Sequence, residues 1–271
     1  MPNLLIHQRR RVFACLAGAL LAVPLAASLA LPGALDAQQA LAPPPAPRPI
    51  VTWHDVRLLG AFTLVAGAVM PADREMQREM QRDWVQHSPL LSHTADVFNA
   101  YGSPGVFAGS AALYAAGWAA GRPDLSRLGL RAGEAIMLSG IVTGGLKGIA
   151  GRARPYASPQ DPGNWSAFGG MHDAARQSFP SGHVTAVFAF ATAMDYELRA
   201  SHPAVAHWAS PAMYGAAALT GFARMHADKH WASDVVMGAG IGLVSGLIVS
   251  RFHADRPNHW IDRHLLPHAR Q

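Results

Sequence analysis

Three short clusters of charged and polar residues carry most of the chemistry that this sequence offers. In the first cluster, Lys147 is followed after six residues by Arg154 and Pro155, near the expected end of a helix. Two cations close together at a helix end are usually solvated side chains whose stems cover apolar surface. They neutralise a bound dianion only when other groups converge on them, so this cluster alone favours the solvated interpretation.

The second cluster is Pro180-Ser181-Gly182-His183, at the start of an apolar and helically periodic run. Ser181 is a favourable N-cap residue, and Gly182 allows a ligand to approach the backbone closely. Unpaired N–H groups at such a helix start favour an anion, and His183 in the first turn would lie beside it. An ordinary capped helix with a surface histidine explains this tetrapeptide equally well.

The third cluster is Arg224-x5-His230-x3-Asp234. His230 and Asp234 are four residues apart and share one face if a helix begins near His230. A carboxylate in reach of a ring N–H fixes the histidine tautomer and leaves the other nitrogen free as nucleophile or base. The alternative is an ordinary surface pair on a helix. The same spacing continues in three glycines, which favour close packing on that face: Gly238, Gly242 and Gly246.

Together the clusters contain three cations, two histidines, one carboxylate and a capped helix start. This set suits phosphoryl transfer, because cations neutralise the charge that builds on the phosphoryl oxygens in the transition state. One group attacks the phosphorus in line, and a separate acid protonates the leaving oxygen.

The order and internal spacings of the clusters, over residues 147–234, resemble the three-part signature of the type 2 phosphatidic acid phosphatase superfamily. That superfamily also contains bacterial acid phosphatases and vanadium haloperoxidases. The resemblance implies that His230 is the nucleophile and forms a phosphohistidine, that Asp234 orients it, and that His183 protonates the leaving group. No metal or other cofactor is implied for phosphatase members. The resemblance assigns the phosphate oxygens to Lys147, Arg154, Ser181, the backbone N–H of Gly182, and Arg224.

One position departs from the family pattern, since Ala223 stands where a serine usually precedes the third-cluster arginine. The departure removes one hydroxyl near the site and leaves the expected nucleophile and acid in place. Other residues are interpreted as rim, loop or solvated tail: His226, Asp228 and Lys229 at the rim, His172 and Asp173 in a long loop, and His253, His259, His264 and His268 in the tail.

The composition fits a helical bundle or a membrane protein. Of 271 residues, 50% are hydrophobic and 14% charged, whereas a typical soluble domain has about 25% charged residues. A disordered charged tail, a coiled coil and a collagen-like chain are excluded. The net charge of +5 has no clustered basic stripe, so no nucleic-acid partner is expected. The single cysteine, Cys15, cannot build a disulfide framework or a thiolate zinc cluster.

Successive apolar periodic runs without strand alternation predict an all-α bundle of about six or seven helices. A long Pro/Gly-rich loop runs from Pro155 to Pro180, and loops of this length are commonly functional. Its aromatic residues Trp165, Phe168 and Phe179 either line a pocket or pin the loop to the bundle. The expected helices cover residues 56–70, 73–86, 104–120, 126–150, 183–199, 203–223 and 231–252.

The N-terminus is typical of an export signal. Arg9-Arg10-Arg11 precedes an apolar run over residues 12–31 and small residues before Ala37, where cleavage is expected. An uncleaved membrane anchor is the alternative, because the run is long. The expected organisation is a signal peptide in residues 1–37, a Pro-rich linker in 38–55, the phosphatase domain in 56–252 and a polar tail in 253–271.

The expected function is metal-independent hydrolysis of a phosphorylated small molecule or a lipid phosphate, with a mildly acidic optimum because His183 must start protonated. The alternatives are a vanadate-dependent haloperoxidase and a non-enzymatic envelope protein. The expected location is the periplasm or the outer side of the envelope, with a slight preference for a periplasmic domain at a membrane surface. Charges in residues 126–150 and 183–199 argue against true spans unless they face the bundle interior.

Overall fold

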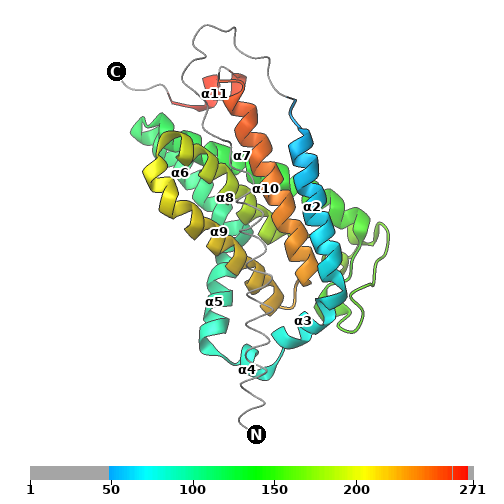
Figure 1. Cartoon of the computed structure of the whole chain (residues 1–271). Coiled ribbons are helices and arrows are strands. Elements are labelled where there is room, and N and C mark those ends of the chain that lie inside the picture. The colour runs from blue at the N-terminus through cyan, green and yellow to red at the C-terminus, as the bar shows by residue number, and fades with distance from the viewer. Residues whose placement is uncertain (1–48, 258, 268–271) are drawn as a thin grey trace.

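The structure is a computed structural model that describes residues 49–257 and 259–267 (Figure 1). These residues form an all-α bundle without strands, which confirms the predicted fold class. The signal peptide expected in residues 1–37 lies outside the described residues. The helices are α2 (Trp53–Val69), α3 (Asp73–Met80), α4 (Asp83–Gln86), α5 (Pro89–Ala100), α6 (Val106–Ala120), α7 (Pro123–Ala150), α8 (Gly182–Ser201), α9 (Pro203–His226), α10 (Ala232–Ala254) and α11 (Trp260–Leu265).

Helix α8 is the centre of the bundle and packs against α7, α9 and α10. Glycines on α10 allow the close contact with α8 that their spacing predicts. A Cβ atom on Gly238 would lie 2.7 Å from the Ser181 carbonyl oxygen, and one on Gly246 would lie 2.5 Å from the Thr192 Cβ. The N-terminal end of α10 is thereby pressed against the N-terminal end of α8.

The region between α2 and α6 differs from the expected single amphipathic helix over residues 73–86. Two helices, α3 and α4, take its place, and α5 follows them although no helix was predicted there. Only Ala95 of α5 is buried, so its sequence has little apolar periodicity. Contacts with α9 stabilise α5, and local sequence patterns do not record such contacts.

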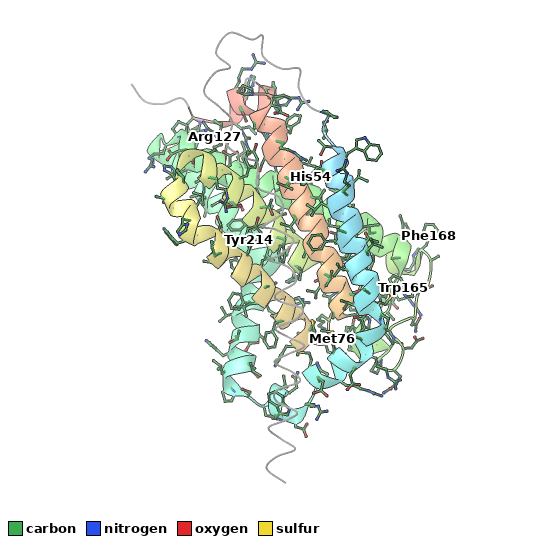
Figure 2. The ribbon with its side chains drawn as sticks, viewed as in Figure 1. His54, Met76, Arg127, Trp165, Phe168 and Tyr214 are labelled. Carbon is green, nitrogen blue, oxygen red and sulfur yellow. The ribbon has the colours of Figure 1, made fainter. Side chains whose placement is uncertain are left out.

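The expectation of a solvated tail from residue 253 is wrong. Helix α10 continues to Ala254, so His253 still lies on a packed turn and is only 5% exposed. Its Nε2 lies 2.7 Å from the Glu134 carboxylate, and Asp262 of α11 lies 2.6 Å from Arg131 Nη2. These contacts tie α11 to the end of the bundle where Arg127 lies, opposite to the end that holds Met76 (Figure 2). His268 lies outside the described residues.

Within the described residues, two segments are long and apolar enough to cross a membrane, Trp53–Met80 and α10. The apolar window of the first is only 17% buried, whereas that of α10 is 83% buried. Helix α10 is therefore a core helix, whereas α2, which lies beside it (Figure 1), exposes Trp53, Val56, Leu64 and Val65. Large apolar side chains are also exposed on other helices: Phe107 and Trp118 on α6, Met137 and Ile141 on α7, and Val205 and Trp208 on α9.

Candidate active site

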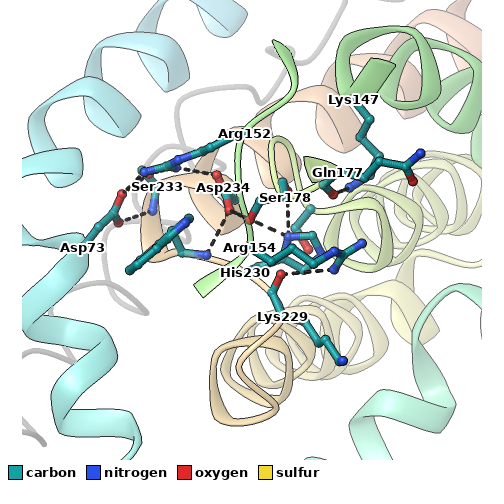
Figure 3. A network of polar contacts seen from close by, with 12 residues as sticks. Asp73, Lys147, Arg152, Arg154, Gln177, Ser178, Lys229, His230, Ser233 and Asp234 are labelled. Carbon is teal, nitrogen blue, oxygen red and sulfur yellow. Dashed lines mark hydrogen bonds and ion pairs between the residues drawn. The ribbon is translucent and has the colours of Figure 1, made fainter. Parts of the chain in front are cut away.

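The three clusters predicted from the sequence lie close together in the structure, and Figure 3 shows Lys147 and Arg154 of the first cluster near His230 of the third. Lys147 lies near the end of α7, Arg224 near the end of α9, and His230 just before α10. The backbone N–H of Ser181, just before α8, donates to the Asp234 carbonyl over 3.0 Å and joins the second cluster to the third. A Cβ atom on Gly182 would lie 3.6 Å from Lys147 Cε, which brings the first cluster to the same place.

His230 is almost fully buried, and its ring orientation is set by a backbone group. Its Nδ1 lies 2.7 Å from the Ser178 carbonyl oxygen but 3.8 Å from Asp234 Oδ2. A nitrogen so close to a carbonyl oxygen must carry the proton, so Nδ1 donates and Nε2 keeps its lone pair. The expected direct hydrogen bond from His230 to Asp234 is therefore replaced by one from His230 to the Ser178 carbonyl, which lies just before the second cluster.

Burial keeps the His230 imidazole neutral. The pKa of His230 is lowered to about 3, chiefly because the ring is removed from water and also because of the charges of Lys147 and Arg154, while Asp234 opposes the shift. The imidazole therefore keeps its Nε2 lone pair throughout the ordinary pH range. A neutral ring with one fixed proton has the electronic state that a nucleophile or base requires.

Asp234 is fully buried and held from three sides. Its Oδ1 accepts from Arg152 Nη1 over 2.5 Å. Its Oδ2 accepts from Ser178 Oγ over 2.5 Å and from the Trp231 backbone N–H over 2.9 Å. The bond to Trp231 makes Asp234 a capping residue of α10 as well as a neighbour of His230.

Three cations converge on the site without carboxylate partners. Lys147 Nζ donates to the Gln177 carbonyl over 2.5 Å, and Arg154 donates through Nε to the Ala174 carbonyl over 3.0 Å. Arg224 Nη1 donates to Asn99 Oδ1 over 2.8 Å. Within residues 49–257 and 259–267, none of these three cations forms an ion pair with a carboxylate. Their charges are therefore available to an anion.

Two buried polar atoms at the site have no hydrogen-bond partner in the described part of the chain, Ser181 Oγ and Arg224 Nε. Ser181 occupies the predicted N-cap position, with extended φ and ψ of −74° and 110°. Its hydroxyl does not bond to the first turn of α8, contrary to the usual behaviour of an N-cap serine. Both atoms can therefore donate to a bound oxyanion.

His183 lies in the first turn of α8 and packs against Gly102. A Cβ atom at position 102 would lie 2.6 Å from the His183 ring carbon Cδ2, so only glycine leaves room for this ring position. Gly102 sits between α5 and α6 in a backbone segment that departs from helical geometry. The position of the expected acid thus depends on a segment that the sequence analysis did not connect with the site.

The sequence analysis missed four polar residues that contact the site, each fixed by a long-range contact. Arg152 and Ser178 bind Asp234 directly, Asp73 of α3 binds Arg152, and Asn99 of α5 binds Arg224. Arg152 lies two residues before Arg154, and Ser178 lies three residues before Ser181. Their proximity to the clusters was the only signal in the sequence, and Asp73 and Asn99 gave none.

The residues that were not assigned to the site from the sequence lie in different environments in the structure. His226 is buried in the last turn of α9, beside the ring of Phe222, and is not a rim residue. Asp228 accepts a hydrogen bond from Gln77, and exposed Lys229 lies 4.5 Å above the Tyr156 ring. Ala223 is fully buried in a cluster with Met80 and Ala95. In the long loop, Asp173 follows His172 and caps a short helix by accepting a 2.8 Å hydrogen bond from the Ala175 N–H.

Loop aromatics fix the long loop to the site. Trp165 and Phe179 meet edge to face at 5.3 Å, and the Arg152 guanidinium lies 4.9 Å from the Trp165 ring. Phe168, by contrast, is exposed on the outer side of the loop (Figure 2). Of the two alternatives, these contacts favour the one in which Trp165 and Phe179 pin the loop to the bundle. Among the described residues, no group of three or more His, Cys, Asp or Glu side chains is placed to hold a metal ion.

The protein is thus an all-α bundle that has a buried histidine, His230, and three cations at one end. These cations, Lys147, Arg154 and Arg224, make that end suited to bind an anion. Residues 128–258, which include all three clusters, match the family model described as PAP2 superfamily. This confirms the resemblance inferred from the three clusters.

Two known proteins show the extent of the similarity. The lipid A 1-phosphatase of Porphyromonas gingivalis is 42% identical over 72 residues, which is 27% of this chain and 15% of that protein. The chain therefore matches only a small part of the length of that relative. The crystal structure of a transmembrane PAP2-type phosphatidylglycerolphosphate phosphatase from Bacillus subtilis has the same fold, with a TM-score of 0.53 and 21% identity. The superposition covers 76% of this chain and 98% of that one.

Proposed function

We propose that the protein is a metal-independent phosphatase that hydrolyses the phosphate monoester of a lipid through a phosphohistidine on His230. The arrangement of one buried neutral imidazole beside three cations without carboxylate partners carries this proposal. The cations bind the phosphoryl oxygens, and the Ser178 carbonyl holds the Nδ1 proton so that Nε2 can attack.

The reaction has two steps. In the first, His230 Nε2 forms a bond to phosphorus, the phosphorus–oxygen ester bond breaks, and His183 gives its proton to the leaving oxygen. In the second, a water oxygen attacks phosphorus and its proton passes to His183. The nitrogen–phosphorus bond then breaks, its electron pair returns to Nε2, and inorganic phosphate leaves. Asp234, which lies 3.8 Å from the ring, offsets the positive charge of the phosphorylated imidazole.

The surface of the bundle supports a lipid substrate and a place in the membrane. The middle of each long helix contains no Asp, Glu, Lys or Arg, and large apolar side chains on α2, α6, α7 and α9 point outward. Arg131 and Glu134 lie further inside α7, but Arg131 is buried and both side chains form ion pairs within the bundle, so they do not oppose a span. The charge-free segments cover residues 58–72, 106–120, 135–146, 184–194, 208–223 and 235–250.

The named relatives support the same substrate class. One is called a lipid A 1-phosphatase and the other a phosphatidylglycerolphosphate phosphatase, and both names describe phosphate on a lipid. Neither name describes halide oxidation, which favours a phosphatase over the vanadate-dependent haloperoxidase. The basic and apolar start of the chain supports placing the site on the outer side of the cytoplasmic membrane.

The test uses the full chain purified in detergent, with phosphatidate, phosphatidylglycerophosphate and an aryl phosphate as separate substrates. We expect phosphate release in the presence of a chelator, fastest with a lipid substrate in mixed micelles. Labelled enzyme quenched during turnover should carry phosphate that is stable in base and labile in acid, as expected of phosphohistidine. Strict dependence on a divalent cation, or halide oxidation with vanadate and peroxide, would contradict the proposal.

Location is tested on membranes from expressing cells. Carbonate extraction should leave the protein in the membrane pellet, whereas a periplasmic domain at the membrane surface would be released. A protease added to spheroplasts should cleave the exposed loop over residues 155–180 if the site faces outward.

A further inference from the structure

A buried chain of charges connects α3 to the residue that faces His230 (Figure 3). Asp73, Arg152 and Asp234 are each essentially inaccessible to solvent. Arg152 Nη2 lies 2.7 Å from Asp73 Oδ2, and Arg152 Nη1 lies 2.5 Å from Asp234 Oδ1. Ser233 joins both partners, because its N–H donates to Asp73 Oδ1 over 2.9 Å and its Oγ accepts from Arg152 Nη1 over 2.8 Å.

The Arg152 guanidinium cannot turn. Nε and Nη2 donate to the Pro162 carbonyl over 3.0 and 2.8 Å, in addition to the bonds to Asp73, Ser233 and Asp234. The Trp165 and Trp231 rings lie 4.9 and 5.6 Å from the guanidinium carbon. Buried charges are costly, and apolar side chains of similar volume commonly stabilise a fold as well or better. Burial of one guanidinium between two carboxylates therefore calls for a role beyond stability.

Arg152 determines which oxygen of Asp234 faces His230. Because Oδ1 is held by Arg152, Oδ2 is left for Ser178, for the Trp231 N–H and for the imidazole 3.8 Å away. Asp73 in turn shares the Arg152 charge. With Asp73 present, the three charges sum to one net negative charge, which is suited to a ring that becomes positive when it is phosphorylated. Without Asp73, Arg152 would neutralise Asp234 alone.

We propose that Asp73 and Arg152 are positioning residues that hold and charge-balance Asp234 during formation of the phosphohistidine. This inference rests on the proposed function. It makes α3, which lies outside residues 128–258, a working part of the site. Neither residue touches the phosphate, so their loss should slow the chemical step and leave substrate binding to Lys147, Arg154 and Arg224 unchanged.

The test compares Asp73→Asn with Asp55→Asn in the full-length enzyme. Asp55 is equally buried and binds Arg251 Nη2 over 2.6 and 2.5 Å, but it lies on α2 at the opposite end of the bundle. Both variants lose one charge from a buried ion pair. We expect kcat of Asp73→Asn to fall about 10- to 100-fold with KM nearly unchanged, which is the usual effect of losing a residue that orients a reactive group. In a single turnover, the phosphoenzyme should form more slowly than in the wild type. Asp55→Asn should keep wild-type kcat and KM despite a lower melting temperature.

A second variant covers the case in which Asp73→Asn does not fold. Ser233→Ala keeps every charge and removes only the hydroxyl that bridges Asp73 and Arg152, so a smaller fall in kcat at constant KM is expected. Equal kcat in the Asp73 and Asp55 variants, or a change confined to KM, would overturn the positioning role alone. A wild-type enzyme that releases no phosphate from any substrate would overturn the proposed function and the positioning role with it.

Discussion

Both ends of the bundle contain a buried histidine and a buried arginine that is paired with carboxylates, but the site end also has three cations without carboxylate partners among the described residues. At the end near α11, Arg131 lies 2.6 Å from Asp262 and within 4 Å of Glu134 and Glu197, and His253 binds Glu134. At the site end, Lys147, Arg154 and Arg224 bind only carbonyl and amide oxygens among the described residues. Cations that are paired with carboxylates connect neighbouring helices, whereas cations without a carboxylate partner can bind an anion.

The end near α11 has a cavity of about 520 Å³. Its charged lining residues are Arg127, Arg131, Arg263, Glu197 and Asp262, so two carboxylates offset two of the three arginines. An anion entering this cavity would meet carboxylates as well as cations. The comparison therefore assigns anion binding to the site end by charge balance and not by cavity size.

The largest expected difference between the ends concerns their histidines. His230→Ala should lower kcat about ten-thousandfold, as loss of a nucleophile does, and leave the fold intact. His253→Ala removes a partner of Glu134 and should lower the melting temperature without changing kcat. Phosphate release and thermal unfolding of both variants check this contrast. Appreciable turnover by His230→Ala would remove the basis for the mechanism.

Substitution of Arg131, which is paired with carboxylates, should lower the stability of the fold and leave kcat unchanged. Arg131→Ala removes a buried cation from beside the partly buried carboxylates of Glu134 and Asp262, and the free energy of unfolding should fall by about 3 kcal/mol. Urea unfolding in detergent measures the loss, and kcat of the protein that remains folded should match wild type. A selective loss of kcat in Arg131→Ala would show that the two ends are coupled.

A smaller effect should follow from Gly102→Ala, whose methyl group would displace the His183 ring. If His183 is the acid, kcat should fall roughly tenfold on a lipid phosphate, which needs a protonated leaving oxygen. An aryl phosphate, whose leaving group is a weaker base, should lose much less. Gly140→Ala, where an added Cβ meets nothing within 4 Å, is the matched control. Equal losses on both substrates would argue for general misfolding.

The smallest effect concerns acid stability. The pKa of His230 is lowered to about 3 by burial, whereas an unfolded chain has a histidine pKa near 6.5. Between these values the unfolded state binds a proton that the folded site rejects, so this histidine costs stability as pH falls from about 6.5 towards 3. Wild type should therefore lose more melting temperature than His230→Ala between pH 7 and pH 4. Parallel losses would show that His230 is charged in the folded protein.

Several features of the site were accessible from sequence because they depend on local spacing. The i, i+4 relation of His230 and Asp234 places both at the start of α10, and the Pro-Ser-Gly-His run predicts the start of α8. The hydrogen bond to His230 was assigned to the wrong group, because a spacing rule considers side chains and the acceptor is the Ser178 carbonyl. The burial of His253 was missed because polarity was taken as a sign of solvent exposure.

The amino-acid sequence by itself determined the helical class, the order of the clusters and the residue types that meet an anion, since each depends on periodicity or on a few neighbouring residues. Only the tertiary structure decided which charges are matched. Arg152 reaches Asp73 and Asp234 across 79 and 82 residues of chain, and Arg224 reaches Asn99 across 125. Such contacts arise when packed helices bring distant residues together, and no local pattern records them.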